Sequence, residues 1–300
     1  MEKTTQKLQE LGRLITHHTP EEGGAQTSLS NLVLFRSSEG QPRQHEVYAA
    51  YLLILVQGEK RLHIGGRPYD YKAGDYLAVF MPMLLEAERA EVPKDKPYLM
   101  ACIEIDLDRI ANLLLKLDRL TPSQFPIESS SAKGFHMAAM SDHLLDPVIR
   151  LLQTLENPRD IAILGEPIVD EIYYRLLCDE QVGFGQLRRH LEQRGQIQEI
   201  ARAVNYIQTN LDMGVSVEKL AHVSNMSVSG FHRTFKEVMH TTPLQYAKTL
   251  KLHRARTLLH EGQTASEASL SVGYNSSAQF SREYKRFFGY PPSETRLAVH

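Results

Sequence analysis

The chain has 300 residues, 42% of them hydrophobic and 23% charged, which is enough apolar material for two ordinary domains. Two cysteines, Cys102 and Cys178, are too few for a disulfide-based fold and favour a reducing cytosol. No apolar run is long enough to span a membrane, so we expect a cytoplasmic protein with no membrane partner. From Arg194 onwards the chain has 13 Lys and Arg against 8 Asp and Glu, whereas before Arg194 it has 21 against 28. Either the basic C-terminal part binds an anionic partner, or the charges of the solvated surface are unevenly distributed.

The first hundred residues combine one amphipathic helix with several short strands. The helix is predicted from Thr4 to Ile15, and after it we expect a flexible polar stretch in which His17 and His18 have no assigned role. Apolar or alternating runs then predict strands at 32–35, 51–56, 61–64, 76–80 and 98–103, separated by turn formers such as Gly65-Gly66. Short strands at this spacing are typical of a small sandwich or barrel.

From residue 106 the hydrophobic periodicity becomes helical. Helices are predicted at 107–117, 142–155, 161–177 and 184–191. An apolar stripe on the second of these is either a dimer face or intramolecular core; it comprises Leu144, Leu145, Val148, Leu151, Leu152 and Leu155. Glycines and the change in charge place a boundary near 183–195. We therefore expect an α+β chain, with an N-terminal β-barrel or sandwich and packed helices in 1–190 (helical segment 106–190) and an all-α domain in 195–300.

The C-terminal domain contains an internal repeat. The segment Phe231-His232-Arg233-Thr234-Phe235-Lys236 recurs 49 residues later as Phe280-Ser281-Arg282-Glu283-Tyr284-Lys285. Each copy predicts a helix, a tight turn and a second helix. In the first copy the helix 217–223 follows a Ser cap, the turn is Ser224-Asn225, and Ser227 or Ser229 caps the next helix. In the second copy, a helix begins at Thr264 or Ser266, the chain turns at Gly273, and Asn275 or Ser276 caps 277–288.

The second helix of each copy has an apolar face and a polar stripe. Positions i, i+3, i+4 and i+7 carry Ser229, His232, Arg233 and Lys236 in one copy and Ala278, Ser281, Arg282 and Lys285 in the other. A DNA recognition helix needs one face that packs against its own domain and an opposite face whose side chains donate hydrogen bonds to bases and phosphates. One such helix is commonly plain solvated surface, but two matched copies favour DNA binding. The helix 243–260 between them is predicted to hold both at a fixed separation, with a basic side of Lys248, Lys251, Arg254 and Arg256.

Residues 216–296 resemble the DNA-binding domain of the AraC/XylS family. The resemblance rests on the repeat and on Pro243-Leu244-Gln245-Tyr246, Val272-Gly273-Tyr274 and Phe287-Phe288-Gly289 with Pro291-Pro292-Ser293. It implies two recognition helices in adjacent major-groove segments about 34 Å apart. Carried over by position, base contacts would come from Val228, Ser229, His232 and Arg233 and from Ser277, Ala278, Ser281 and Arg282. The two arginines would read guanine, and Lys236 and Lys285 would hold phosphate.

Two positions depart from this family's pattern. Asn225 stands in the first turn where Gly is commoner, and we expect the turn to survive because Asn tolerates a left-handed backbone. Ala268-Ser269 stands where the family usually has Ile-Ala, and the smaller Ala268 is expected to loosen the second unit.

The strand-rich segment, above all residues 71–77, is similar to the cupin-like sensor domain of AraC-type regulators. This resemblance implies a small-molecule effector, a homodimer and RNA polymerase as a partner. Catalytic cupins use clustered histidines with a Glu as metal ligands, whereas His45 and His63 stand alone, so we expect no metal, cofactor or catalytic residue. Arg61 and His63 share one strand face and are the candidates for an anionic effector, the alternative being solvated surface.

The leading interpretation is a transcriptional activator or repressor that binds double-stranded promoter DNA at specific sequences. The alternatives are a cupin-type enzyme fused to a DNA-binding domain and a non-specific architectural DNA binder. Cys102 and Cys178 are interpreted as inert buried thiols. The alternative is that one of them is a reactive thiol that senses aldehydes or oxidants.

Overall fold

A computed structural model describes residues 2–120, 134–178 and 194–295. The chain divides into two compact units, Met1–Arg194 and Gly195–His300. The predicted helix at 184–191 lies outside the described residues. No helix among those described is both long and apolar enough to cross a membrane.

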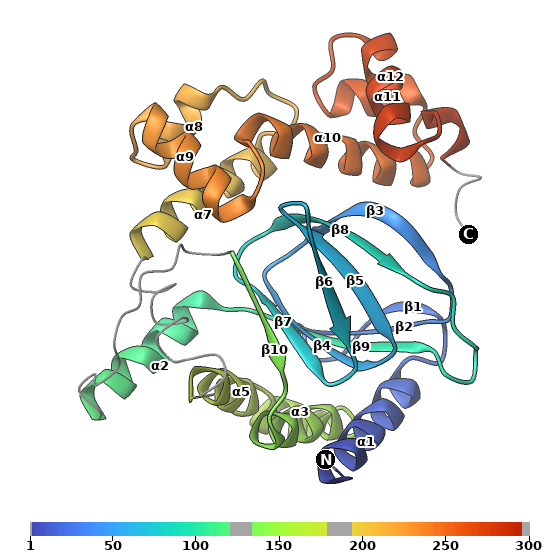
Figure 1. The fold of residues 1–300 in the computed structure, drawn as a ribbon, viewed down its shortest axis with the longest axis vertical. Coiled ribbons are helices and arrows are strands. Elements are labelled where there is room, and N and C mark those ends of the chain that lie inside the picture. Colours follow the sequence, from blue (N-terminus) through green and yellow to red (C-terminus); the bar gives the residue numbers. More distant parts are fainter. Residues whose placement is uncertain (1, 121–133, 179–193, 296–300) are drawn as a thin grey trace. The chain divides into compact units, whose positions relative to one another are not determined.

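The first unit contains two antiparallel sheets (Figure 1). The six-stranded sheet has the order β1 (Gly23–Gln26), β2 (Leu32–Ser37), β9 (Tyr98–Glu104), β4 (Tyr51–Gln57), β7 (Asp75–Val79) and β10 (Phe135–Ala139). The four-stranded sheet has the order β3 (Gln41–Tyr48), β8 (Met83–Arg89), β5 (Glu59–Ile64) and β6 (Arg67–Lys72).

The two sheets form a sandwich, and the alternative of a closed barrel is wrong because the described strands pair within two separate ladders. The sheets meet along β6, where the Tyr71 hydroxyl donates to the Leu53 carbonyl of β4 at 2.7 Å and the Tyr69 ring lies edge-on to Phe135 of β10. Strand alternation places opposite faces of the six-stranded sheet in different cores: Leu99, Ala101 and Ile103 join the helices, while Tyr98 and Cys102 take the other face.

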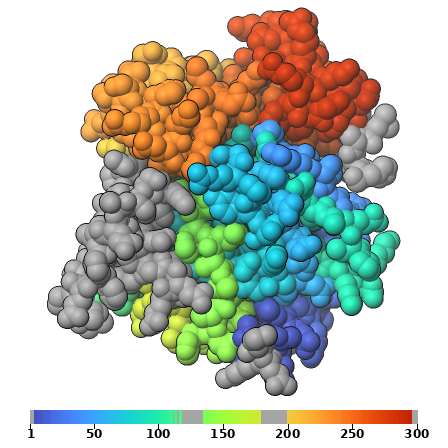
Figure 2. All heavy atoms as spheres, viewed as in Figure 1, coloured from blue at the N-terminus to red at the C-terminus, as the bar shows by residue number. Residues whose placement is uncertain are grey.

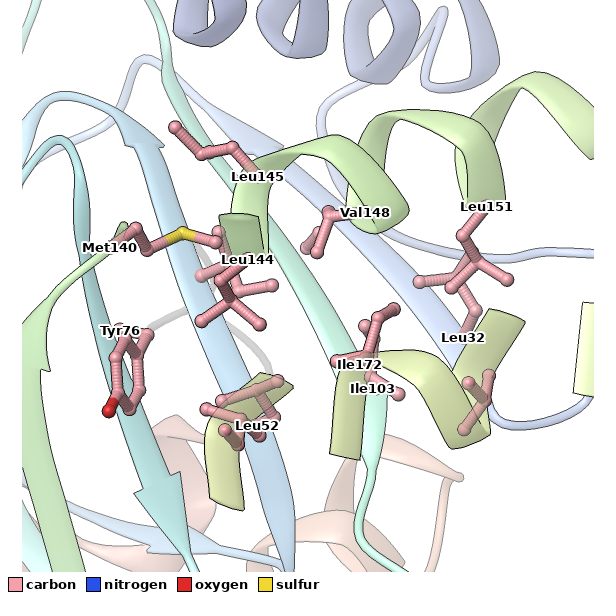
Figure 3. Close-up of a cluster of buried hydrophobic side chains, with 14 of the residues drawn as sticks. Leu32, Leu52, Tyr76, Ile103, Met140, Leu144, Leu145, Val148, Leu151 and Ile172 are labelled. Atoms are coloured by element: carbon pink, nitrogen blue, oxygen red, sulfur yellow. The ribbon is translucent and has the colours of Figure 1, made fainter. Parts of the chain in front are cut away.

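Three helices cover the six-stranded sheet: α1 (Glu2–His18), α3 (Asp142–Thr154) and α5 (Glu166–Cys178). Their core is the cluster in Figure 3, where leucines of α3 lie over Leu32, Leu52 and Ile103 of the sheet. The apolar stripe of α3 is therefore intramolecular core, since all of it but half-buried Leu155 is buried, and it leaves no dimer face there. Beside these helices lies α2 (Leu107–Leu120). The helix predicted at 161–177 is divided in two: a π-helical turn, η1 (Ile161–Gly165), is followed by α5. A short helix, α4 (Pro158–Asp160), precedes η1.

The second unit consists of helices. In chain order they are α7 (Arg194–Thr209), α8 (Val217–Val223), α9 (Val228–Met239), α10 (Pro243–His260), α11 (Ala265–Ser271), α12 (Ser277–Phe288) and the 3₁₀ turn η2 (Pro292–Glu294). In Figure 2 the two halves of the repeat form adjoining orange and red lobes of this unit.

Candidate nucleic-acid interface

The first helix-turn-helix is α8, a turn at Ser224-Asn225, and α9. The Ser227 Oγ accepts from the backbone N–H of Gly230 at 3.2 Å, so Ser227 is the N-cap of α9. Asn225 has φ 55°, which confirms that the turn needs the left-handed conformation that Asn tolerates. Phe231 and Phe235 are fully buried, and the Phe235 ring contacts Tyr246 of α10. The back of α9 is therefore fixed to the rest of the unit.

The second helix-turn-helix is α11, a turn at Gly273, and α12. Thr264 and Glu267 form a capping box that begins α11, and Ser276 caps α12 by accepting from the Gln279 N–H at 3.3 Å. Phe280 and Tyr284 are fully buried among residues of α10 and α11. Ala268 is fully buried in the same core.

The predicted contact residues lie on the free faces of α9 and α12. All ten are exposed except Ser281, which is half-buried. Val228 is 46% exposed although it is apolar. Within the part of the chain that the structure describes, no hydrogen bond or ion pair engages Arg233, Lys236, Arg282 or Lys285. Their charges are therefore available to an anionic partner.

On the basic side of α10, Lys248 forms an ion pair with α12. Lys248 Nζ lies 2.9 Å from Glu283 Oε2 of α12, and the Tyr274 hydroxyl donates to the same carboxylate oxygen at 2.9 Å. Burial raises the pKa of Glu283, but hydrogen bonds from Lys248, Tyr274 and Gln279 outweigh burial and hold it below its ordinary value of 4.5. Arg256 lies over the Phe288 ring at 4.8 Å. These contacts brace α12 against α10.

A second brace holds the turn of the second helix-turn-helix against the segment that precedes the first. Gly273 has φ 74°, and a Cβ added there would lie 2.8 Å from the carbonyl carbon of Asp212, with the carbonyl oxygen closer still. Asp212 belongs to the connection between α7 and α8. Burial lowers the pKa of Lys251 and the nearby Asp212 carboxylate opposes that shift, so Lys251 of α10 lies at the same junction. This close approach, together with α10, therefore connects the second helix-turn-helix to the segment that leads into α8.

In the first unit, Arg61 and His63 lie on the outer face of β5. Arg61 Nε is 2.8 Å from Asp70 Oδ1, and His63 Nε2 is 3.0 Å from Glu88 Oε1. Arg61 also lines a hollow of about 490 Å³. The charged residues lining this hollow are Glu59, Lys60, Arg61, Asp70, Lys72, Glu88 and Arg89. Arg61 and His63 therefore already have carboxylate partners.

The inner face of β5 carries a charge that sequence reasoning missed. Lys60 is 8% exposed, and its Nζ lies 3.0 Å from Glu46 Oε2 of β3 and over the Tyr48 ring. Burial lowers the pKa of Lys60, although Glu46 opposes this shift. Burial raises the pKa of Glu46, but interactions with Lys60, Gln41 and Tyr48 together lower it below its ordinary value. The available signal was the alternation of β5, which places Lys60 on the same face as Leu62 and Ile64.

The two cysteines have different environments. Cys102 is buried, and burial raises the pKa of its thiol to about 12. Cys178 is exposed at the end of α5, so its interpretation as a buried thiol is wrong. The core leucines of α5 occupy other faces of the helix, which leaves its last residue in solvent.

Comparisons with known proteins match both units. The model of the AraC-type transcriptional regulator N-terminus matches residues 28–184, just over half of the chain, and a helix-turn-helix domain model matches 220–298. The lactose operon transcription activator of Staphylococcus xylosus is 23% identical over 82% of this chain and 82% of its own length. The raffinose operon regulatory protein RafR of Pediococcus pentosaceus is 25% identical over 56% of this chain and 60% of its own. An apo point variant of ToxT from Vibrio cholerae shares the fold, with a TM-score of 0.53 at 8% identity, over 93% of this chain and all of that one.

Proposed function

Because this chain belongs to the family of AraC-type transcriptional regulators, with a helix-turn-helix DNA-binding domain and an N-terminal regulatory domain, we propose that α9 and α12 read successive major-groove segments of double-stranded promoter DNA. One observation carries this proposal. The two matched helices each have a packed apolar back and an exposed front whose Arg and Lys side chains are unpaired among the described residues.

The contacts follow from the position of each side chain on its helix. Base edges are read by Val228, Ser229, His232 and Arg233 of α9 and by Ser277, Ala278, Ser281 and Arg282 of α12. A guanidinium donates to guanine O6 and N7 together, which makes Arg233 and Arg282 the main determinants of sequence preference. Lys236 and Lys285, one helical turn further on, hold phosphate and contribute affinity without sequence preference.

The experiment compares Arg233→Ala and Arg282→Ala with Arg202→Ala, which removes an exposed arginine from α7. Sites are first selected by the wild-type protein from random duplexes. Each recognition-helix variant should lose about 1–3 kcal/mol on the selected site and relax its preference at one base pair, while Arg202→Ala keeps wild-type preference. An unchanged preference in both variants contradicts the assignment. Equal wild-type affinity for selected and random DNA supports an architectural binder instead.

The regulatory input is a small polar effector bound in the first unit. Its hollow of about 490 Å³ has the size of known ligand pockets, and its alternating positive and negative groups can bond to many hydroxyls. The relatives named for lactose and raffinose operons make these sugars the first probes. A binding sugar should raise the Tm of the wild-type chain and leave that of Arg61→Ala unchanged. A shift that survives Arg61→Ala, or no shift with either sugar, contradicts this assignment.

The protein acts as a homodimer that contacts RNA polymerase at the promoter. The relatives that it matches are transcriptional regulators, which favours this role over the fused-enzyme interpretation. Because the stripe of α3 is buried, the dimer contact uses another face of the first unit. Sedimentation equilibrium tests the dimer, and transcription from a bound promoter with purified polymerase tests the second contact.

A further inference from the structure

The ends of α1 and α3 lie together in the first unit. Thr4 Oγ1 donates to Asp142 Oδ1 at 2.8 Å, and Glu10 accepts from Gln153 at 3.1 Å, so the two helices run parallel. Their C-terminal ends carry His17 and His18, in the last turn of α1, and Glu156, two residues beyond α3. The expectation of a flexible stretch at these histidines is wrong, because Leu11 and Ile15 are fully buried and hold α1 in place as far as His18.

The three side chains converge, and the described part of the chain offers them no other partner. Their ligand atoms all lie within 4.8 Å of one another. The two imidazole rings meet edge to face, with centroids 4.9 Å apart. His18 Nε2 is buried and has no hydrogen-bond partner among the residues that the structure describes, an arrangement that proteins avoid unless something else satisfies the nitrogen. Among the described residues, neither His17 nor the Glu156 carboxylate forms a hydrogen bond or ion pair.

The chemistry of this set suits a transition-metal cation. Two imidazole nitrogens and one carboxylate oxygen are a common ligand set for Zn²⁺ and related divalent ions, which also leaves a position for water. Two parallel helices end here, and the partial negative charge of each C-terminus favours a cation. Tetrahedral Zn²⁺ needs ligand atoms roughly 3.3 Å apart. Exposed His17 and Glu156 can close the remaining distance by rotating about their side-chain torsions.

We propose that His17, His18 and Glu156 bind a divalent cation of the Zn²⁺ class and thereby tie the end of α1 to the end of α3. The sequence interpretation considered metal ligands only on the strands, where histidines stand alone. These ligands come from the ends of two helices that are more than a hundred residues apart in sequence. The site lies in the helical layer, so it is independent of the proposed DNA contacts.

The test uses the full chain without an affinity tag, stripped of metal with a chelator. Zinc is titrated against a chromogenic competitor, and Co²⁺ is added separately to detect a tetrahedral visible spectrum. We expect one ion per chain and a zinc-dependent rise in the Tm of the first unit. The variants are His17→Gln/His18→Gln and Glu156→Gln, and the matched control is His260→Gln at the exposed end of α10.

Each site variant should bind zinc roughly tenfold or more weakly and lose the rise in Tm, while the control behaves as wild type. The metal-free Tm of each variant shows whether it is folded. If a variant is destabilised without metal, the Co²⁺ spectrum of the milder Glu156→Gln decides, because loss of a ligand changes the spectrum of folded protein. Binding that persists in both variants, or no binding by the wild type at micromolar zinc, overturns the proposal.

Discussion

Replacing Gly273 by Ala tests whether the turn of the second helix-turn-helix is held against the α7–α8 connection by direct contact. Two costs add in this variant. A side chain at φ 74° costs about 1–2 kcal/mol, because Cβ crowds the following carbonyl. The new methyl group would also lie 2.8 Å from the Asp212 carbonyl carbon, and relieving such an overlap in packed structure costs about 1–3 kcal/mol. We therefore expect a loss of about 3 kcal/mol.

Gly289→Ala provides the matched control. Gly289 has φ 86° at the end of α12, and nothing lies within 4 Å of a Cβ added there. Only the backbone cost applies, so we expect a loss of about 1–2 kcal/mol, smaller than that of Gly273→Ala. Hydrogen exchange of the α12 amides in the full chain measures both losses as changes in opening free energy. Equal losses in the two variants would refute the contact with Asp212.

The same contact has a consequence for DNA binding. If the overlap pushes α11 and α12 away from the α7–α8 connection, the recognition helices lose their fixed separation. Gly273→Ala should then weaken binding to a selected two-segment site by more than it weakens binding to either segment alone. A proportionate loss on both kinds of DNA would assign the spacing to α10 instead.

Two further predictions concern titratable groups. Because the folded pKa of Glu283 lies below 4.5, its carboxylate stabilises the unit above that pH, and this contribution is lost as the pH falls through the folded pKa. In urea titrations, the free energy of unfolding of Glu283→Gln should be about 1 kcal/mol below that of the wild type at neutral pH, and the difference should be smaller near pH 4. A difference that does not change with pH would contradict the pairing of Glu283 with Lys248. Iodoacetamide at neutral pH should alkylate exposed Cys178 and spare Cys102, whose pKa is raised to about 12, as mass spectrometry of the native protein can show; rapid labelling of Cys102 would contradict its burial.

Much of the second unit could be predicted because its signals are local. Caps, turn residues and hydrophobic period lie within a few residues of the helices that they define. Ser216 caps α8 as predicted, and the structure selects Ser227 and Ser276 from the two candidates that the sequence offered for α9 and for α12. The strands of the first unit were harder to predict. β3 and β6 carry mostly polar residues, and they are strands because β8 and β5 offer them ladder hydrogen bonds.

The sequence by itself determined that two matched helices present Arg and Lys stripes, because helical period alone sorts the residues of α9 and α12 into a back and a front. Only the tertiary structure decided which charges remain free. Lys248 and Arg282 look alike in sequence, yet Lys248 is paired with Glu283, 35 positions away, while Arg282 is unpaired among the described residues. Pairing depends on which distant segments the fold brings into contact, and helical period carries no information about that.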